Sequence, residues 1–298
     1  MSGSSTFKLK DKFIGYVDIL GFTEHMRAAE KGKGFKSDEL FNIAKRLGAI
    51  HTRDEFRQYG PTTCPQSKPI NRDLDYEVTQ QFDCVVISCE PSAIGCLNLV
   101  SHCWSACMML LTKGLLCRGY IVRGNIYHDG YDVSGSGYFD AIRNEKGVSF
   151  FKREADERGT PFIEVDPEVV RFIEANGDEC VRKMFRRQVK TNGGLSAIYP
   201  FSALSHSFII GGFGIKFDPD KEKHSNNNLR ISLKNVRVKV VELTPTGDFN
   251  AARKVRHYLD AIDAQLQLCD KIDADLDGLL RPFGIRSSKD TTPGLFRD

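Results

Sequence analysis

The sequence lacks a marked excess of charge of either sign. Its 298 residues carry 42 basic and 39 acidic side chains, a formal net charge of +3. This balance gives no argument for a nucleic-acid partner, and it does not oppose an anionic substrate. Hydrophobic residues make up 41% and charged residues 27% of the chain. Those proportions are typical of a globular protein and exclude a disordered or fibrous one.

The sequence also lacks an uninterrupted apolar segment long enough to cross a membrane. A bilayer span needs about 20 mostly apolar residues, whereas the longest apolar stretch, 96–116, contains Asn98, His102 and Lys113. We therefore expect a buried helix there. The first residues, MSGSSTFKLKDKF, hold no apolar core for a signal peptide. These two absences predict a cytoplasmic protein that does not bind membranes.

No Cys-x-x-Cys pair occurs among the nine cysteines. Cys96, Cys103 and Cys107 recur at helical spacing near His102, which admits either a metal site or small side chains buried in a core helix. Since no second cluster supplies further ligands, the buried helix is the favoured interpretation.

Local patterns predict strands and helices in alternation. Apolar runs rich in β-branched and aromatic residues predict strands at 13–20, 76–88 (a pair with a turn at Phe82 and Asp83), 115–127, 162–165 and 230–243. Cap residues and periodicity predict helices after Thr23, from Ser37 to about 50, and at 92–113, 138–146, 166 onward and 249–275.

This order predicts an α+β fold, a ferredoxin-like palm with insertions. No repeat or low-complexity linker divides the chain, so we expect one domain over 1–298. Its core motifs would lie in 13–146, further strands and a helix in 160–275, and a tail in 276–298.

Two aspartates stand out because each adjoins a core strand. Asp18 lies between Val17 and Ile19, and Asp83 precedes the apolar run Cys84-Val85-Val86-Ile87. Burying a lone carboxylate is costly. The pair is explained either by two turn-capping aspartates or by a shared site for Mg²⁺ or Mn²⁺, which prefer oxygen ligands.

The residues around Asp18 resemble a known motif. Asp18-Ile19-Leu20-Gly21-Phe22-Thr23 is similar to the first metal motif of class III nucleotidyl cyclases, a strand ending in Asp-Ile-x-Gly-Phe-[Ser/Thr]. Gly21 would let the backbone approach phosphates, and the amides of Leu20 to Thr23 lie at a helix start, where anions bind.

Two later segments agree with this resemblance. Gln80-Gln81-Phe82-Asp83 looks like the hairpin that carries the second metal aspartate, and Phe82, where the family usually has Gly, is most similar to the Pycsar antiphage pyrimidine cyclases. The stretch from Arg118 to Glu145 resembles the strand, turn and last active-site helix. Arg143 falls on the catalytic arginine, and Phe139 replaces the family's asparagine.

The resemblance implies a function. The chain would convert a nucleoside triphosphate, UTP or else CTP, to a 3′,5′-cyclic monophosphate and diphosphate, using two Mn²⁺ or Mg²⁺ ions. The cyclic product would signal phage infection to a separate effector. Class III domains act as homodimers that share their active sites, so Arg143 would serve the partner's metal site.

The resemblance also assigns residues to the site. Metal ligands would be Asp18, Asp83 and the Ile19 carbonyl, with Arg143 as the third catalytic residue. The substrate would contact Phe22, Thr23, Tyr76, Thr79 and Arg118, with Gln81 a further candidate in the base pocket. Tyr76 is explained equally by a tyrosine that packs on the face of the sheet, and Arg118 has the alternative of a surface strand residue. Lys234 and Lys239 lie where the family has a phosphate-binding lysine, but with Arg230 and Arg237 nearby a solvated strand face is the favoured explanation.

Three other functions stay open on the sequence. One is a non-catalytic nucleotide-binding module with the same fold, which the replacement of asparagine by Phe139 favours. The second is a different palm enzyme, such as a diguanylate cyclase or a polymerase-like domain, although Gln80-Gln81-Phe82-Asp83 stands where the former would have a Gly-Gly-[Asp/Glu]-Glu-Phe hairpin. The third is a metal-dependent phosphohydrolase, which would release a linear monophosphate.

Overall fold

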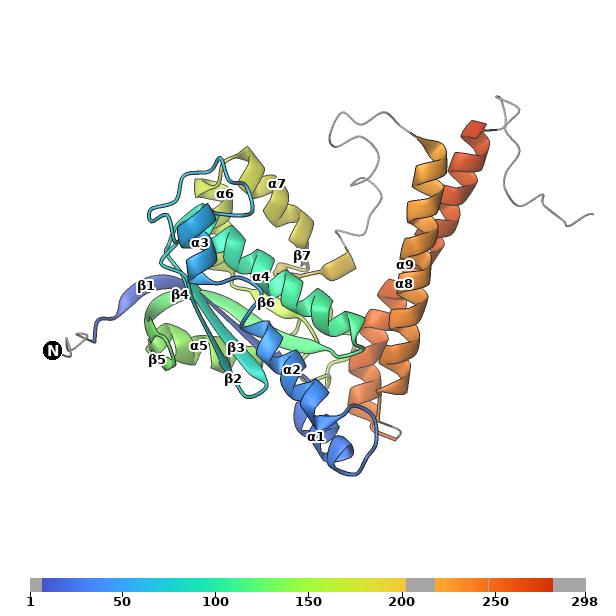
Figure 1. The fold of residues 1–298 in the computed structure, drawn as a ribbon, viewed down its shortest axis with the longest axis horizontal. Helices are drawn as coiled ribbons and strands as arrows, with labels where there is room; N and C mark the ends of the chain where they lie inside the picture. Colours follow the sequence, from blue (N-terminus) through green and yellow to red (C-terminus); the bar gives the residue numbers. More distant parts are fainter. Residues whose placement is uncertain (1–6, 202–217, 246, 281–298) are drawn as a thin grey trace, which may run out of the picture.

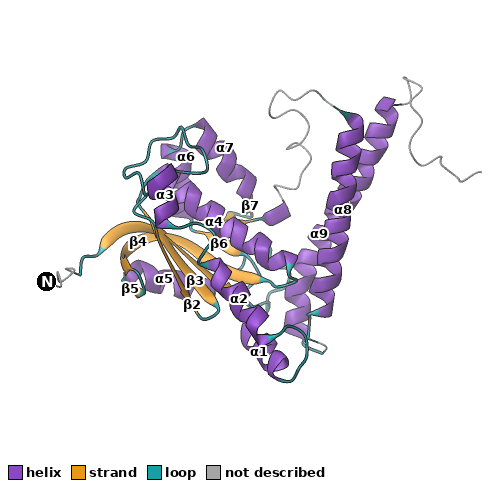
Figure 2. Cartoon of the chain, viewed as in Figure 1, coloured by secondary structure: helices purple, strands orange, loops and turns teal. Residues whose placement is uncertain are grey.

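The computed structural model describes residues 7–201, 218–245 and 247–280. The chain forms an α+β fold in which helices cover a mostly antiparallel sheet (Figures 1 and 2). A pair of long helices stands beside this body (Figure 1).

The centre of the sheet has the predicted palm topology. Its four strands are β1 (Lys10–Ile19), β2 (Glu77–Gln81), β3 (Cys84–Cys89) and β4 (Cys117–Asp129). They lie in the order β2-β3-β1-β4, and each pair is antiparallel. With helices between β1 and β2 and between β3 and β4, this is the βαββαβ arrangement of a ferredoxin-like fold. The α+β palm predicted from the sequence is confirmed.

Shorter strands extend this sheet beyond β4. β6 (Ile163–Val165) is parallel to β4, and β8 (Leu195–Ile198) and β7 (Val189–Asn192) continue the sheet to its far edge. β5 (Asp132–Ser134) forms a hairpin with the end of β4.

The two faces of the sheet are covered unequally. One face packs against α4 (Ala93–Thr112), which the Ser92 hydroxyl caps, together with the helices α2 (Ser37–Leu47), α6 (Pro167–Asn176) and α7 (Glu179–Gln188). The other face carries a small cluster beneath α5 (Ser136–Glu145). Gly124 and Gly137 allow this close packing, because a Cβ added at Gly124 would lie 2.8 Å from the Gly137 Cα. Two further helices are α1 (Phe22–Glu30) and α3 (Arg53–Tyr59).

Helix α4 alone, among the described residues, is long and apolar enough to cross a membrane by length and composition. In its apolar window, 78% of the residues are buried inside the fold.

Cys96, Cys103 and Cys107 are buried thiols on this helix, and the His102 ring bonds the Tyr76 hydroxyl and the Leu47 carbonyl. The predicted core helix is confirmed, and cytoplasmic localisation stays a prediction.

The C-terminal region corrects one prediction. The expected strand at 230–243 is wrong, since those residues belong to helix α8 (Pro219–Glu242), which pairs with α9 (Phe249–Leu280). Leu233 and Val240 are buried in this pairing, and Arg237 binds Asp263 across it. Together α8 and α9 form a long helical hairpin, whose lower half packs against the body (Figure 1). The expected tail at 276–280 is the end of α9, and 281–298 lie outside the described residues.

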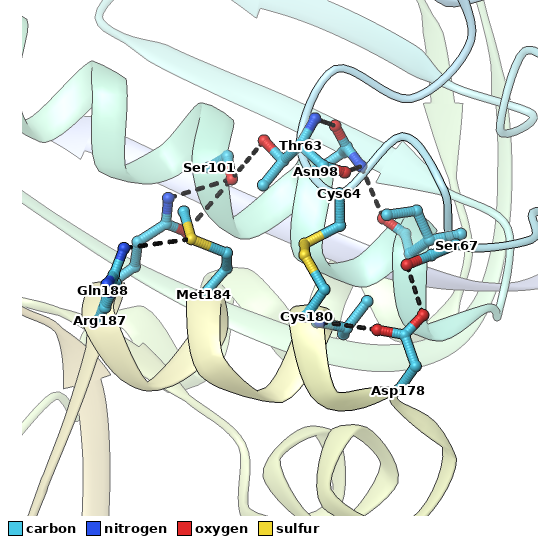
Figure 3. Close-up of a disulfide and its surroundings, with 12 residues drawn as sticks. Thr63, Cys64, Ser67, Asn98, Ser101, Asp178, Cys180, Met184, Arg187 and Gln188 are labelled. Carbon is cyan, nitrogen blue, oxygen red and sulfur yellow. Dashed lines mark hydrogen bonds between the residues drawn. A yellow bond between two sulfur atoms is a disulfide. The ribbon is translucent and has the colours of Figure 1, made fainter. Parts of the chain in front are cut away.

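A disulfide joins the loop after α3 to helix α7. It links Cys64 and Cys180, whose Cα atoms are 6.0 Å apart (Figure 3). Beside it the Ser67 hydroxyl donates to Asp178 at 2.5 Å, and the Thr63 amide donates to the Asn98 side chain at 3.2 Å. The sequence spacing gave no sign of this pairing. Disulfides are rare in reducing compartments. Whether this bond forms therefore depends on the redox state of the compartment that holds the protein.

Candidate active site

Asp18 is the penultimate residue of β1, at the centre of the sheet. Across the two strand pairings its neighbours are Cys84 on β3 and Arg118 on β4. Side chains alternate between the faces of a strand, and Val17 and Ile19 are buried in the core beneath α4. Asp18 and Arg118 therefore share the opposite face of the sheet, which α5 partly covers.

The β2–β3 turn places Asp83 beside the end of β1. Phe82 in this turn has a left-handed φ of 51°, and its ring is exposed. The Ile19 amide donates a hydrogen bond to the Asp83 carbonyl oxygen at 3.0 Å. This bond ties the turn to β1, so two aspartates far apart in the sequence become neighbours.

The surroundings of Asp18 raise its pKa from 3.8 to about 7. Burial is the largest cause, and the charges of Asp83 and Glu145 act in the same direction, while Arg118 and Lys254 oppose them. Carboxylates crowded in this way repel each other, and a divalent cation between them would remove the repulsion. The two aspartates therefore fit a hard divalent metal ion.

The number of carboxylates also fits magnesium chemistry. Within the described ranges, no group of three or more His, Cys, Asp or Glu side chains is arranged to hold a metal ion. Mg²⁺ is commonly bound by one or two carboxylates, with water and substrate phosphates completing its octahedron. The Ile19 side chain has no ligand atom, so only the backbone carbonyl of this residue could serve the ion. Its carbonyl as a ligand stays a prediction.

Arg118 lies at the site and is already paired. Its Nε donates to the carboxylate of Glu145, the last residue of α5, which is 4% exposed. A substrate phosphate would have to compete with Glu145 for this guanidinium. Glu145 itself was not predicted as a site residue, because the sequence shows it only as the end of an amphipathic helix.

Lys254 is the second functional residue that the sequence analysis missed. It lies on α9, and its electrostatic partners include Arg118, Glu145 and Asp18. Burial and the Arg118 charge lower the pKa of Lys254. Among described residues its ammonium makes no hydrogen bond or ion pair. A half-buried cation without a fixed acidic partner is suited to receive an anion.

A pocket of about 170 Å³ opens beside Lys254. The β1–α1 junction forms one wall through Leu20, Gly21 and His25, and the hairpin forms another with Leu243. The helical hairpin is therefore part of the walls around the candidate site.

Helix α1 begins at this pocket with free backbone amides. Its cap residue, Gly21, has a left-handed φ of 71°, and no side chain caps the helix. Uncapped amides at a helix start bind phosphate. Phe22 and Thr23, predicted to contact substrate, are the first two residues of α1; Phe22 packs against the core and Thr23 is exposed.

The predicted base-pocket residues do not lie on one face of the sheet. Thr79 and Gln81 lie on the same face as Asp18, but the Thr79 hydroxyl is buried and bonded to the His128 ring at 2.8 Å. Tyr76 is fully buried on the α4 side, where its hydroxyl bonds His102 at 2.9 Å. Tyr76 precedes β2, and its ring is enclosed between Phe56 and His102, away from Asp18. The prediction that Tyr76 contacts the base is therefore wrong.

Arg143 does not join the acidic pair within one chain. It lies on α5 with its side chain 74% exposed, and it pairs with Asp140 at 2.6 Å. Phe139, one turn earlier, is also exposed. This placement leaves the predicted role of Arg143 in a partner's site untested.

Lys234 and Lys239 do not lie on a strand beside the site. Both belong to α8, and the Lys239 ammonium donates to the Thr112 carbonyl at 3.0 Å. Lys234 is exposed. The alternative of a solvated face holds for Lys234, and the lysine that acts on Asp18 together with Arg118 is Lys254.

Comparisons with known proteins add little. No family model matches the sequence, and no curated protein matches it. Among solved structures, a Class III adenylyl cyclase-like ATP-binding protein from Pseudomonas aeruginosa is similar over 55% of this chain and 35% of that one, with 11% identity and a TM-score of 0.32. The chain thus spans about a third of that protein's length. A likeness this distant carries no argument about function.

Proposed function

We propose that the protein is a nucleotidyl cyclase of the class III type. The observation that carries the proposal is the pairing of Asp18 with Asp83 at adjoining strand ends, beside the uncapped start of α1. In the reaction the ribose 3′ oxygen bonds to the α-phosphorus, diphosphate leaves, and the hydroxyl proton is released.

Each residue of the site has a proposed task. Asp18 and Asp83 would hold two Mg²⁺ or Mn²⁺ ions, which would activate the 3′-hydroxyl and neutralise the triphosphate. The amides of Phe22 and Thr23 receive phosphate oxygens, and Arg118 and Lys254 balance the remaining negative charge.

We propose a pyrimidine substrate, UTP before CTP, and a cyclic product that a separate effector reads in antiphage defence. The support is the sequence resemblance at Gln80 to Asp83. Gln81 lies on the face of Asp18 and is half-buried. Its Oε1 accepts a hydrogen bond from the Tyr138 hydroxyl at 3.5 Å, so its NH2 group is the part that would donate to a base edge.

We further propose a homodimer in which Arg143 completes the partner's site and stabilises charge on the α-phosphate. Its exposure on α5, close to the exposed ring of Phe139, supports this arrangement. The dimer would also cover aromatic surface that one chain leaves in water.

The rival function is a nucleotide-binding module without catalysis. It is favoured by Phe139, which stands where the resembled family has the ribose-orienting asparagine and cannot donate a hydrogen bond. Such a module would bind a nucleoside triphosphate and metal without turning it over.

The test is to incubate the purified chain with Mn²⁺ and each of ATP, GTP, CTP and UTP, and to identify products by mass spectrometry. We expect a 3′,5′-cyclic nucleotide from UTP, lost in Asp18→Asn and kept in Asp54→Asn, a change of an exposed acid on α3. Binding without turnover would support the module, and a linear monophosphate would support a phosphohydrolase.

A further inference from the structure

A second pocket lies where helix α9 meets the edge of the sheet. Its volume is about 390 Å³, within the range of small-molecule sites. Asn192 at the end of β7 and Tyr199 after β8 form one side, and His257 and Ala261 of α9 form the other. The pocket shares no residue with the one beside Gly21 and Lys254.

Aromatic rings form the walls of this pocket. Phe151 and Tyr199 are half-buried, with ring centroids 6.1 Å apart. Phe162 lies behind them, 6.5 Å from Tyr199 and nearly parallel to it. Aromatic side chains of this kind stack planar heterocycles such as nucleic-acid bases.

Cations without acidic partners lie beside these rings. The Lys190 ammonium is 4.5 Å from the Tyr199 ring centroid and 4.8 Å from that of Phe151. Lys152 lines the pocket. In the described part of the chain, neither ammonium forms a hydrogen bond or an ion pair.

The other charged groups of the pocket are already paired. Arg153 binds Asp260 at 2.5 Å, and the His257 ring bonds Glu157 at 2.7 Å. The charge left over at the pocket is therefore positive, next to an aromatic wall.

We propose that this pocket binds a nucleoside monophosphate. The base stacks on the Tyr199 ring in place of the Lys190 ammonium, which lies over that ring at the pocket edge. The displaced Lys190 ammonium and Lys152 then hold the phosphate. The Asn192 side chain, at the pocket wall, supplies a donor and an acceptor for the base edge. The site stands apart from the proposed cyclase reaction, because it uses neither Asp18 nor a metal ion.

The experiment measures nucleotide binding to the full chain by titration calorimetry, using UMP and AMP as probes. EDTA and an Asp18→Asn background suppress metal-dependent binding at the candidate active site. We expect saturable binding of at least one nucleotide.

Lys190→Glu and Lys152→Glu should each weaken the binding of this nucleotide about tenfold or more, since each replaces a cation at the phosphate by an acid. Uridine and inorganic phosphate should each bind at least tenfold more weakly than the nucleotide.

Lys183→Glu is the matched control, an exposed lysine of α7 outside the pocket, and it should leave binding unchanged. Both test lysines are exposed, so circular dichroism should report folded variants. The proposal is overturned if neither nucleotide binds, or if Lys183→Glu weakens binding as much as the pocket variants do. It is also overturned if Lys254→Gln abolishes binding while Lys190→Glu and Lys152→Glu leave it intact.

Discussion

Replacing Asp18 by asparagine should change how the stability of the metal-free protein depends on pH. In the folded chain the pKa of Asp18 is about 7, against 3.8 for an ordinary aspartate. The folded state therefore holds a proton that the unfolded state has lost between about pH 4 and pH 7. Stability falls as pH rises through this interval, because ionising the buried carboxyl is costly only in the folded state.

The magnitude follows from the two pKa values. A difference of about three pH units corresponds to an upper limit of about 4 kcal/mol. Asp18 keeps some contact with solvent, which screens its charge, so we expect about 1–2 kcal/mol. Asparagine has a similar shape and no charge, and it should remove this contribution.

The assay is urea unfolding in EDTA at pH 4.5 and pH 8, followed by circular dichroism. The loss of stability between the two pH values should be about 1–2 kcal/mol larger for the natural chain than for Asp18→Asn, with Asp54→Asn matching the natural chain. Mn²⁺ added at pH 8 should stabilise the natural chain more than Asp18→Asn. If both chains show the same pH dependence, the crowding of carboxylates around Asp18 is not real.

Three further predictions concern other parts of the molecule. Lys254→Gln should raise the KM for the nucleoside triphosphate about tenfold to a hundredfold, as expected for a lost charged phosphate contact, whereas Lys234→Gln on the exposed side of α8 should leave steady-state kinetics unchanged. Mixing inactive Asp18→Ala and Arg143→Ala chains should restore activity in a product assay if the sites are shared between subunits, and the absence of recovery would contradict the dimer. Cys180→Ser should lower the free energy of unfolding by about 2–4 kcal/mol under oxidising conditions and by much less in dithiothreitol; equal values in both conditions would mean that the disulfide does not form.

The palm could be predicted because its local signals agree with its topology. The apolar strand around Asp18, the turn at Phe82 and the Ser92 cap each specify one local structure, and a βαββαβ order leaves few arrangements of the strands. The neighbouring positions of Asp18 and Asp83 then follow from the pairing of β1 with β3.

The prediction of a strand at 230–243 was wrong because the apolar residues of this segment fit both the two-residue period of a strand and the 3.6-residue period of a helix. Apolar residues at 231, 233, 236, 238 and 240 alternate for short stretches, as in a strand. Residues 229, 233, 236 and 240 also follow helical spacing, and these face the interior. The deciding signal was Asp218-Pro219, where the aspartate caps the helix and proline occupies its first turn.

Lys254 and the disulfide had no local signal at all. Lys254 reaches the candidate site only because α9 packs beside the junction of β1 and α1. No sequence motif predicts this tertiary contact. Cys64 and Cys180 are 116 residues apart and lie in a loop and a helix without a spacing rule. Tyr76 is different, since a tyrosine that packs in the core was already an alternative on the sequence, and the structure buries its ring completely.

The central claim is that the carboxylates of Asp18 and Asp83 together coordinate divalent cations. Anomalous diffraction from crystals grown with Mn²⁺ and a non-hydrolysable UTP analogue tests it directly. The expected result is a manganese peak about 2 Å from a carboxylate oxygen of each aspartate, with the triphosphate running toward the start of α1. A nucleotide bound without manganese at these carboxylates, or manganese held elsewhere in the molecule, would contradict it.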